Sequence, residues 1–135
     1  MSNPVRVEQR VRFQEFSLSR LPSGECEASV TLSLEGKGPA RASARSASAE
    51  SGELHCAAQA CLNALAEVTR ETAFELLGVK AVQAFDATVV IVSVASPGQS
   101  DGPRLVGSYL AGSDLPRGAA LAVLNATNRV LAIRS

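Results

Sequence analysis

Residues 57–64 read AAQACLNA and residues 119–126 read AALAVLNA, so six of eight positions are identical at an offset of 62 residues. Each stretch lies in a segment whose apolar residues recur every three or four positions, which is the spacing of an amphipathic helix. A short alanine-rich match arises easily by chance. The match gains weight only if the segments before the two helices are also alike.

A second pair of matching stretches occurs in the same order. Residues 27–34 (EASVTLSL) match residues 86–93 (DATVVIVS) in their succession of acidic, alanine, hydroxyl and aliphatic residues, at an offset of 59. Both pairs fall in a β-β-β-α succession, which indicates a tandem duplication. A unit of roughly sixty residues cannot cover both faces of its sheet with one helix, whereas two units packed together can. The sequence predicts a single α+β domain over residues 1–135, with duplicated β-β-β-α units at about 1–70 and 71–135 and antiparallel sheets packed against two helices.

Alternation of apolar and polar residues predicts the strands. They span 5–19, with a bulge near Gln14; 25–35; 41–49; 74–85, with an irregularity at Gly78; 86–95; and 104–111. Residues 86–95 are apolar on both faces, which indicates a strand covered on both sides. Two alternatives stay open, namely a Ser/Ala-rich loop at 41–49 and a first helix that runs on to Leu77.

Turn and capping residues mark the boundaries of these elements. Residues 36–39 (GKGP) predict a turn, and Ser51 is expected to cap the first helix. The last helix is expected to begin after Gly112-Ser113-Asp114, with Asp or Ser as its cap, and to run to about Leu131.

The composition excludes several classes of function. Thirteen basic and thirteen acidic residues cancel, so no field attracts a phosphate backbone and no nucleic acid is expected as a partner. The longest apolar run, residues 87–95, is too short to cross a bilayer, so no membrane association is expected. The polar start of the chain has no signal-peptide pattern, which favours a cytoplasmic location. Cys26, Cys56 and Cys61 match no metal-ligand spacing, and we expect neither a metal nor a cofactor.

The second unit carries surplus apolar surface. Its strand 86–95 is apolar on both faces, and Leu121, Leu124 and Leu131 lie outside the main apolar stripe of its helix. The first unit can cover only part of this surface. We expect a second chain to cover the rest, which predicts a homodimer.

The second unit also resembles a known family. Gly112-Ser113-Asp114-Leu115 is followed by Leu124-Asn125-Ala126-Thr127-Asn128-Arg129, and the interval from Asp114 to Asn125 is that of the C-terminal regulatory domain of 2-isopropylmalate synthases. The resemblance covers about residues 73–132 in sequence and the whole chain in topology. It implies a duplicated β-β-β-α fold, dimerisation and a leucine-like effector. Because the synthase's catalytic barrel is absent, it implies no acyl transfer. Gly118-Ala119 stands where the family has an Ala-Ser pair.

The candidate ligand site is the turn Gly112-Ser113-Asp114, at the start of the last helix. Free backbone N–H groups there can hold a carboxylate, and Asp114 can accept from an ammonium group, which suits an amino acid. Gly107, in the preceding strand, would allow the ligand to approach the backbone closely. The alternative is helix capping alone, which needs the same residue types.

Three polar residues of the last helix are candidates for an oligomer contact. Asn125, Asn128 and Arg129 share one side of this helix, where they can form hydrogen bonds to a partner chain. Asn63 matches Asn125 across the repeat and is expected to face solvent or an oligomer contact, since it lies opposite the apolar stripe. The alternative for all four residues is a solvated helix surface.

Three functions remain to be weighed. The first is a non-catalytic, homodimeric regulatory module that binds a small amino-acid-like effector. The second is a purely structural or protein-interaction subunit that has lost the effector pocket, which Gly118-Ala119 favours. The third is an enzyme that uses Cys56 or Cys61 with His55. No nucleophile, base and orienting group recur at a catalytic spacing, so we expect no enzyme.

Overall fold

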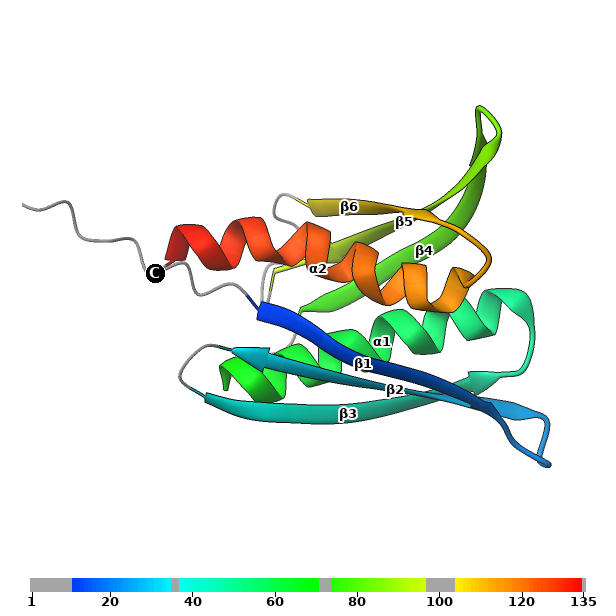
Figure 1. Ribbon diagram of the computed structural model, residues 1–135, viewed down its shortest axis with the longest axis horizontal. Coiled ribbons are helices and arrows are strands. Elements are labelled where there is room, and N and C mark those ends of the chain that lie inside the picture. Colours follow the sequence, from blue (N-terminus) through cyan, green and yellow to red (C-terminus); the bar gives the residue numbers. More distant parts are fainter. Residues whose placement is uncertain (1–10, 35–36, 71–73, 97–103, 135) are drawn as a thin grey trace, which may run out of the picture.

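A computed structural model describes residues 11–34, 37–70, 74–96 and 104–134, with the backbone alone for Lys37 and residues 129–134. These residues form two antiparallel three-stranded sheets and two helices (Figure 1), which confirms the α+β class and the repeated β-β-β-α units. The elements are β1 (Val11–Arg20), β2 (Glu25–Leu34), β3 (Lys37–Ala47), α1 (Glu50–Thr69), β4 (Glu75–Ala84), β5 (Ala87–Ala95), β6 (Arg104–Ala111) and α2 (Leu115–Arg134).

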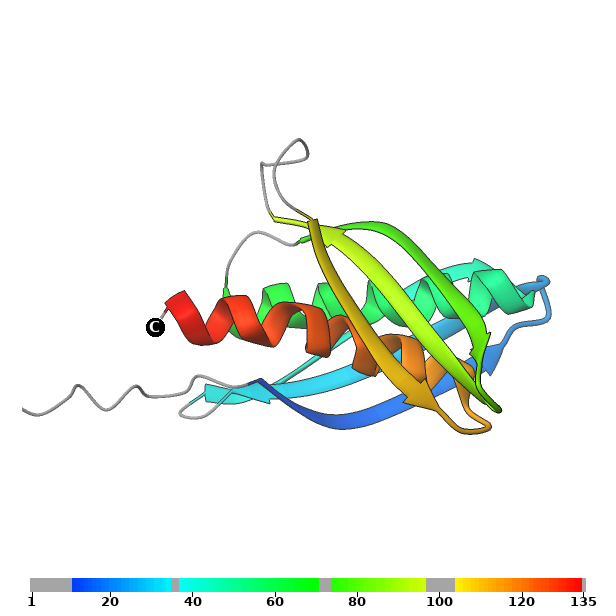
Figure 2. The same cartoon turned by 90° about the horizontal axis from the view of Figure 1, so that it is seen from above.

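The helices lie between the two sheets. The first sheet has the strand order β1-β2-β3 and the second β4-β5-β6, so β2 and β5 are the central strands. In Figure 1 both helices form the middle layer, and in Figure 2 the strands of the second sheet cross obliquely over them. Each sheet therefore has an inner face that packs on helices and an outer face that points away from them.

Side-chain alternation determines which face of each central strand is buried. On β2, alternate residues from Cys26 to Leu34 are at most 4% exposed, as predicted, because they meet α1. On β5, Val90, Val92 and Val94 are buried, whereas Val89 and Ile91 are half-buried. The prediction that residues 86–95 are covered on both sides is therefore wrong for the isolated chain.

The strand match that supported the duplication is off by three residues. An offset of 59 places the inward-facing Val30 and Leu32 on Val89 and Ile91, which face outward. The helices' offset of 62 instead places them on Val92 and Val94, which are buried. An odd error in register exchanges the two faces of a strand. The sequence of β2 matches that of β5 at either offset because β5 is aliphatic on both faces, so Val30 and Leu32 fall on aliphatic residues in both alignments.

Both repeats carry a bulge at the same place in the first strand. In β1 the pairing shifts between Phe13 and Glu15, which confirms the bulge predicted near Gln14. In β4 it shifts between Leu76 and Gly78, next to the predicted irregularity. Phe13 pairs with Leu32 and Leu76 pairs with Val94, and these two partners correspond at the offset of 62. The bulge is therefore part of the repeated unit.

Residues 41–47 form a strand rather than a loop. β3 starts at Lys37, so Gly38 and Pro39 belong to the strand and not to the predicted turn, whose remaining residue, 36, lies outside the described residues. Pro39 is tolerated because β3 is an edge strand.

The first helix begins earlier than predicted and without a side-chain cap. Its N-cap residue is Ala49, which makes no capping hydrogen bond from its side chain, and the predicted cap Ser51 already lies inside the helix. Glu50 and Glu53 place negative charge in this first turn. The helix ends at Thr69, followed by Arg70 with a φ of 58°, so it does not continue to Leu77.

The second helix begins as predicted. The backbone N–H of Arg117 donates to Asp114 Oδ1 at 3.2 Å, which makes Asp114 the cap. This helix continues to Arg134, one turn beyond the predicted end. Alanine is the most frequent residue at the buried positions of both helices. Residues 57–64 and 119–126 follow the same sequence of buried and exposed positions, apart from a half-buried Asn63 against an exposed Asn125.

Candidate functional site

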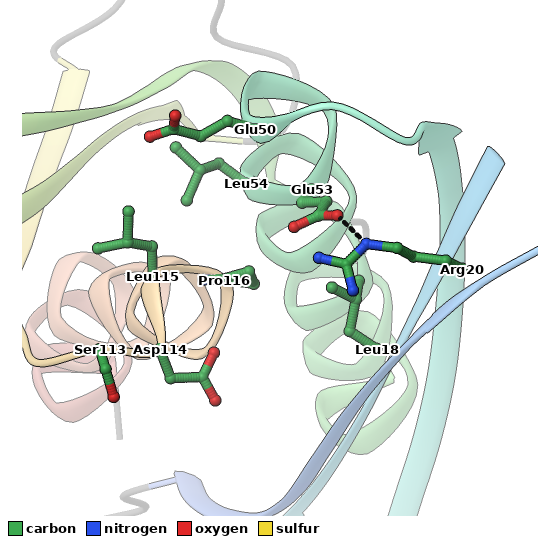
Figure 3. Close-up of a pocket in the computed structure, with 9 residues that line it drawn as sticks. All are labelled: Leu18, Arg20, Glu50, Glu53, Leu54, Ser113, Asp114, Leu115 and Pro116. Carbon is green, nitrogen blue, oxygen red and sulfur yellow. Dashed lines mark hydrogen bonds and ion pairs between the residues drawn. The ribbon is translucent and has the colours of Figure 1, made fainter. Parts of the chain in front are cut away.

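A pocket of about 330 Å³ lies where the two helices begin (Figure 3). Both repeats contribute to it, so we call it the inter-repeat pocket. Its lining residues are Leu18, Arg20, Glu50, Glu53, Leu54, Ser113, Asp114, Leu115 and Pro116. Because β1 and the start of α1 form one side and the start of α2 forms the other, neither repeat makes this pocket alone.

The polar lining of the inter-repeat pocket has three carboxylates, one guanidinium and the Ser113 hydroxyl. Arg20 Nε donates to Glu53 Oε2 at 2.8 Å. The side chain of Arg20 is 69% exposed and that of Glu53 is 13% exposed, so the pair lies at the pocket's rim with the carboxylate inward. In Figure 3 the Asp114 carboxylate points across the gap toward Leu18 and Arg20. With Glu50 included, the lining is acidic overall.

The rest of the lining is apolar. Leu54 from α1 is 4% exposed, and Leu18, Leu115 and Pro116 are partly exposed. In Figure 3 Leu54 and Pro116 extend from their helices toward the space between them. A ligand with charged groups at one end and an aliphatic part at the other fits such a lining.

The structure separates the four predicted ligand residues. Ser113 and Asp114 line the inter-repeat pocket. Gly112 is exposed beside it, and a Cβ added there would meet no atom within 4 Å. Gly107 is buried against α2, where an added Cβ would overlap the backbone oxygen of Ala122 and the backbone nitrogen of Ala126. The close approach expected at Gly107 is therefore made by a helix.

Sequence reasoning missed the contribution of the first repeat. Arg20, Glu50 and Glu53 belong to β1 and α1, far from residues 112–114 in the chain. The acidic first turn of α1 is visible in the sequence, but only the packing of the repeats shows that it faces Asp114.

The predicted interface residues form hydrogen bonds within the chain. Asn125 Oδ1 accepts from the N–H of Ser108 in β6 at 3.1 Å. Asn128 accepts from the N–H of Val11 at 3.3 Å and donates to its carbonyl at 3.4 Å, in β1. Asn63, expected to face solvent or an oligomer contact, is half-buried and donates to the Ser43 carbonyl of β3 at 3.2 Å. The side chain of Arg129 lies outside the described residues.

The three thiols are buried and the histidine is not. Cys26, Cys56 and Cys61 are each 0% exposed, and the Sγ atoms of Cys26 and Cys56 are 3.4 Å apart. Desolvation, followed by the hydrogen bond shared with Cys26, raises the pKa of Cys56 to about 12. Burial also raises the pKa of Cys61. His55 is exposed on α1. Among residues 11–34, 37–70, 74–96 and 104–128, no three His, Cys, Asp or Glu side chains gather to hold a metal ion.

A second hollow, of about 580 Å³, lies at the opposite end of α1. It is lined by Glu67, Val68 and Arg70 at the end of α1 and by residues 38–41 of β3. None of the ligand-binding or interface residues predicted from the sequence lines this hollow.

Neither helix in the described part of the chain is long and apolar enough to cross a membrane.

No protein-family model matches the chain, and no curated protein matches it.

Proposed function

We propose that the chain is a non-catalytic, homodimeric binding module that takes a small amino-acid-like effector in the inter-repeat pocket. The observation that carries the proposal is the composition of this pocket. It joins an exposed guanidinium, three carboxylates and an aliphatic wall, in a volume of about 330 Å³.

Each part of an amino acid has a counterpart in the pocket lining. The start of α1 has no side-chain cap, so its first N–H groups can bind a carboxylate together with the exposed Arg20. The Asp114 and Glu50 carboxylates can accept from the ammonium group. Leu18, Leu54 and Leu115 supply apolar contact for an aliphatic side chain. The resemblance of the second repeat to a leucine-binding regulatory domain agrees with this arrangement.

The remaining parts of the proposal rest on separate observations. Three buried free cysteines, two of them in contact without a disulfide, favour a reducing compartment such as the cytoplasm. The absence of catalysis is supported by the thiols, since a nucleophile that is 0% exposed cannot meet a substrate.

Isothermal titration calorimetry with a panel of amino acids, leucine included, tests the effector claim. We expect millimolar or tighter binding of at least one aliphatic amino acid, weakened about tenfold or more by Asp114→Asn or Arg20→Gln. Asn still caps a helix well, so the first variant removes charge without removing the cap. The control is Asp86→Asn, which removes an exposed carboxylate in the β4–β5 turn. Absence of heat with every amino acid at millimolar concentration would refute the effector claim.

A second candidate is a purely structural or protein-interaction subunit. It is favoured by large apolar side chains exposed on the second repeat, with Phe85 99%, Leu110 66% and Val106 53% exposed. Absence of amino-acid binding, together with stable self-association, would favour this candidate over the first.

A further inference from the structure

The outer face of the second sheet is mostly apolar. Strand pairing places its outward residues in rows across β4, β5 and β6; three rows form the middle of the face, and a charged row, Glu75–Ala95–Arg104, lies at one end. The three middle rows are Val82–Val89–Leu110, Lys80–Ile91–Ser108 and Gly78–Ser93–Val106. Figure 2 is viewed toward this sheet from above. Lys80 is the one charged side chain in the three middle rows, and it lies on the edge strand β4 rather than at the centre.

The first sheet is a matched comparison within the same chain. At the offset of 62, its central strand places Glu27, Ser29 and Thr31 where the second sheet has Val89, Ile91 and Ser93. The corresponding rows of the first sheet are Ser19–Glu27–Arg45, Ser17–Ser29–Ser43 and Glu15–Thr31–Arg41. Ser29 and Ser43 share a hydrogen bond of 2.8 Å. The fold is therefore compatible with a polar outer face, and folding alone does not explain the apolar one.

We propose that a second copy of this chain packs on the outer face of the second sheet, about a two-fold axis that runs parallel to β5. This inference rests on the homodimer part of the proposed function and specifies its interface. Rotation about such an axis keeps each row in place and exchanges β4 with β6. Val89 and Ile91 then face their own counterparts, Val82 faces Leu110 of the second copy, and Gly78 leaves room for its Val106.

The position of Lys80 supports this axis over the perpendicular one. With the axis along β5, Lys80 faces the Ser108 hydroxyl of the second copy, to which an ammonium can donate. With an axis across the strands through Ile91, Lys80 would face Lys80 of the second copy. Two like charges in an apolar interface are strongly unfavourable. Of the two arrangements with aligned strands, the face is thus self-complementary in only one.

Pairing through three of the four edge strands, namely β1, β3 and β6 but not β4, is hindered by asparagines. Asn125 occupies the N–H of Ser108 on the edge of β6, and Asn63 occupies the carbonyl of Ser43 on the edge of β3. Asn128 occupies both backbone groups of Val11 on the edge of β1. A strand of a second copy would have to displace these side chains. A face-to-face contact requires no such loss.

The area of the face suits a reversible dimer. Strands of up to ten residues, spaced as in any sheet, give a face of roughly 30 Å by 14 Å. Two such faces cover on the order of 840 Å², in the range of weak and transient interfaces. We therefore expect a monomer–dimer equilibrium that depends on concentration.

Sedimentation equilibrium of the full chain over a concentration series tests the interface. We expect the wild type to dimerise, and Ile91→Lys to weaken the dimer by roughly 100-fold or more, because two ammonium groups meet on the axis. Ser29→Lys, at the corresponding position of the first sheet, should dimerise as the wild type does. A wild type that stays monomeric, or an Ile91→Lys chain that dimerises normally, would overturn the proposal.

A cross-linking variant keeps the test decisive if Ile91→Lys fails to fold. Val89→Cys places a thiol near the axis along β5, whereas the perpendicular axis brings Val89 opposite Ser93. Mild oxidation should link Val89→Cys into covalent dimers and leave Lys80→Cys monomeric; the reverse pattern contradicts the proposed axis. The native cysteines are buried and give little background. Amino-acid binding does not enter these measurements, so the effector claim and the interface fail independently.

Discussion

Replacement of Gly107 by alanine tests whether this residue is needed for packing against α2. A packing role predicts a lower free energy of unfolding, whereas a role in ligand binding alone would leave stability unchanged. In the native chain Gly107 lies on the inner face of β6, directly against α2. The added Cβ would overlap the Ala122 carbonyl oxygen and the Ala126 nitrogen, and lie 2.7 Å from the Ala126 Cβ. Since two of these atoms are helix backbone, no side chain can rotate away, and α2 or β6 has to move.

The expected cost follows from this geometry. Overpacking of a well-packed core by one carbon typically costs 1–3 kcal/mol, and contacts with fixed backbone place Gly107→Ala at the upper end, about 3 kcal/mol. Movement of α2 also shifts Ser113 and Asp114 in the inter-repeat pocket. Amino-acid affinity is therefore expected to fall together with stability.

Urea denaturation followed by circular dichroism measures this cost. Gly38→Ala is the matched control, because Gly38 also lies in an edge strand and its added Cβ meets no atom within 4 Å. That variant should be unchanged or more stable by up to about 1 kcal/mol. A Gly107→Ala chain as stable as the wild type would refute the packing role.

Three further predictions concern the thiols and the helix ends. The free energy of unfolding should fall by about 1.4 kcal/mol per pH unit for each of Cys56 and Cys61 as the pH rises above 9.0, because these thiols ionise there in the unfolded chain, while burial raises both pKa values in the folded chain, that of Cys56 to about 12. Denaturation at pH 9 to 10.5 checks this, and an unaltered slope in Cys61→Ala would contradict it. Asn125→Ala should cost about 0.5–1 kcal/mol and speed hydrogen exchange at the Ser108 amide, since solvent replaces the lost acceptor; unaltered exchange would argue against that bond. Asp114→Ala should lower stability by about 1 kcal/mol and Asp114→Asn by much less, and equal losses would show that capping is not the cause.

The fold could be predicted from the sequence wherever one face of an element is polar. The alternation from Cys26 to Leu34 identified both faces of β2 correctly, because Glu27, Ser29 and Thr31 mark the outer one. On β5 both faces are aliphatic, so the alignment of β2 with β5 could be wrong by three residues while Val30 and Leu32 still matched aliphatic residues. The start of α1 was misplaced because a serine near a helix start predicts a cap, whereas the chain already turns at Ala49.

The candidate site could be predicted only in part, because it is formed by tertiary contact. Ser113 and Asp114 show a helix start in the sequence, and they line the inter-repeat pocket. The approach of Arg20 and Glu50 depends on how the two repeats pack, which no local pattern encodes. Asn125 and Asn128 were predicted to contact a partner chain because they are polar residues on one side of a helix. The strand backbones that they bind lie 17 and 117 residues away in the chain, so no local pattern indicates these bonds.

In the proposed function the two repeats jointly form one binding site at the starts of α1 and α2. Amide chemical-shift mapping by nuclear magnetic resonance, during titration with the best-binding amino acid, tests it most directly. We expect shifts that saturate and concentrate on residues 50–54 and 113–117, from both repeats. Shifts confined to one repeat, or centred on Arg41 and Arg70 at the other end of α1, would contradict it.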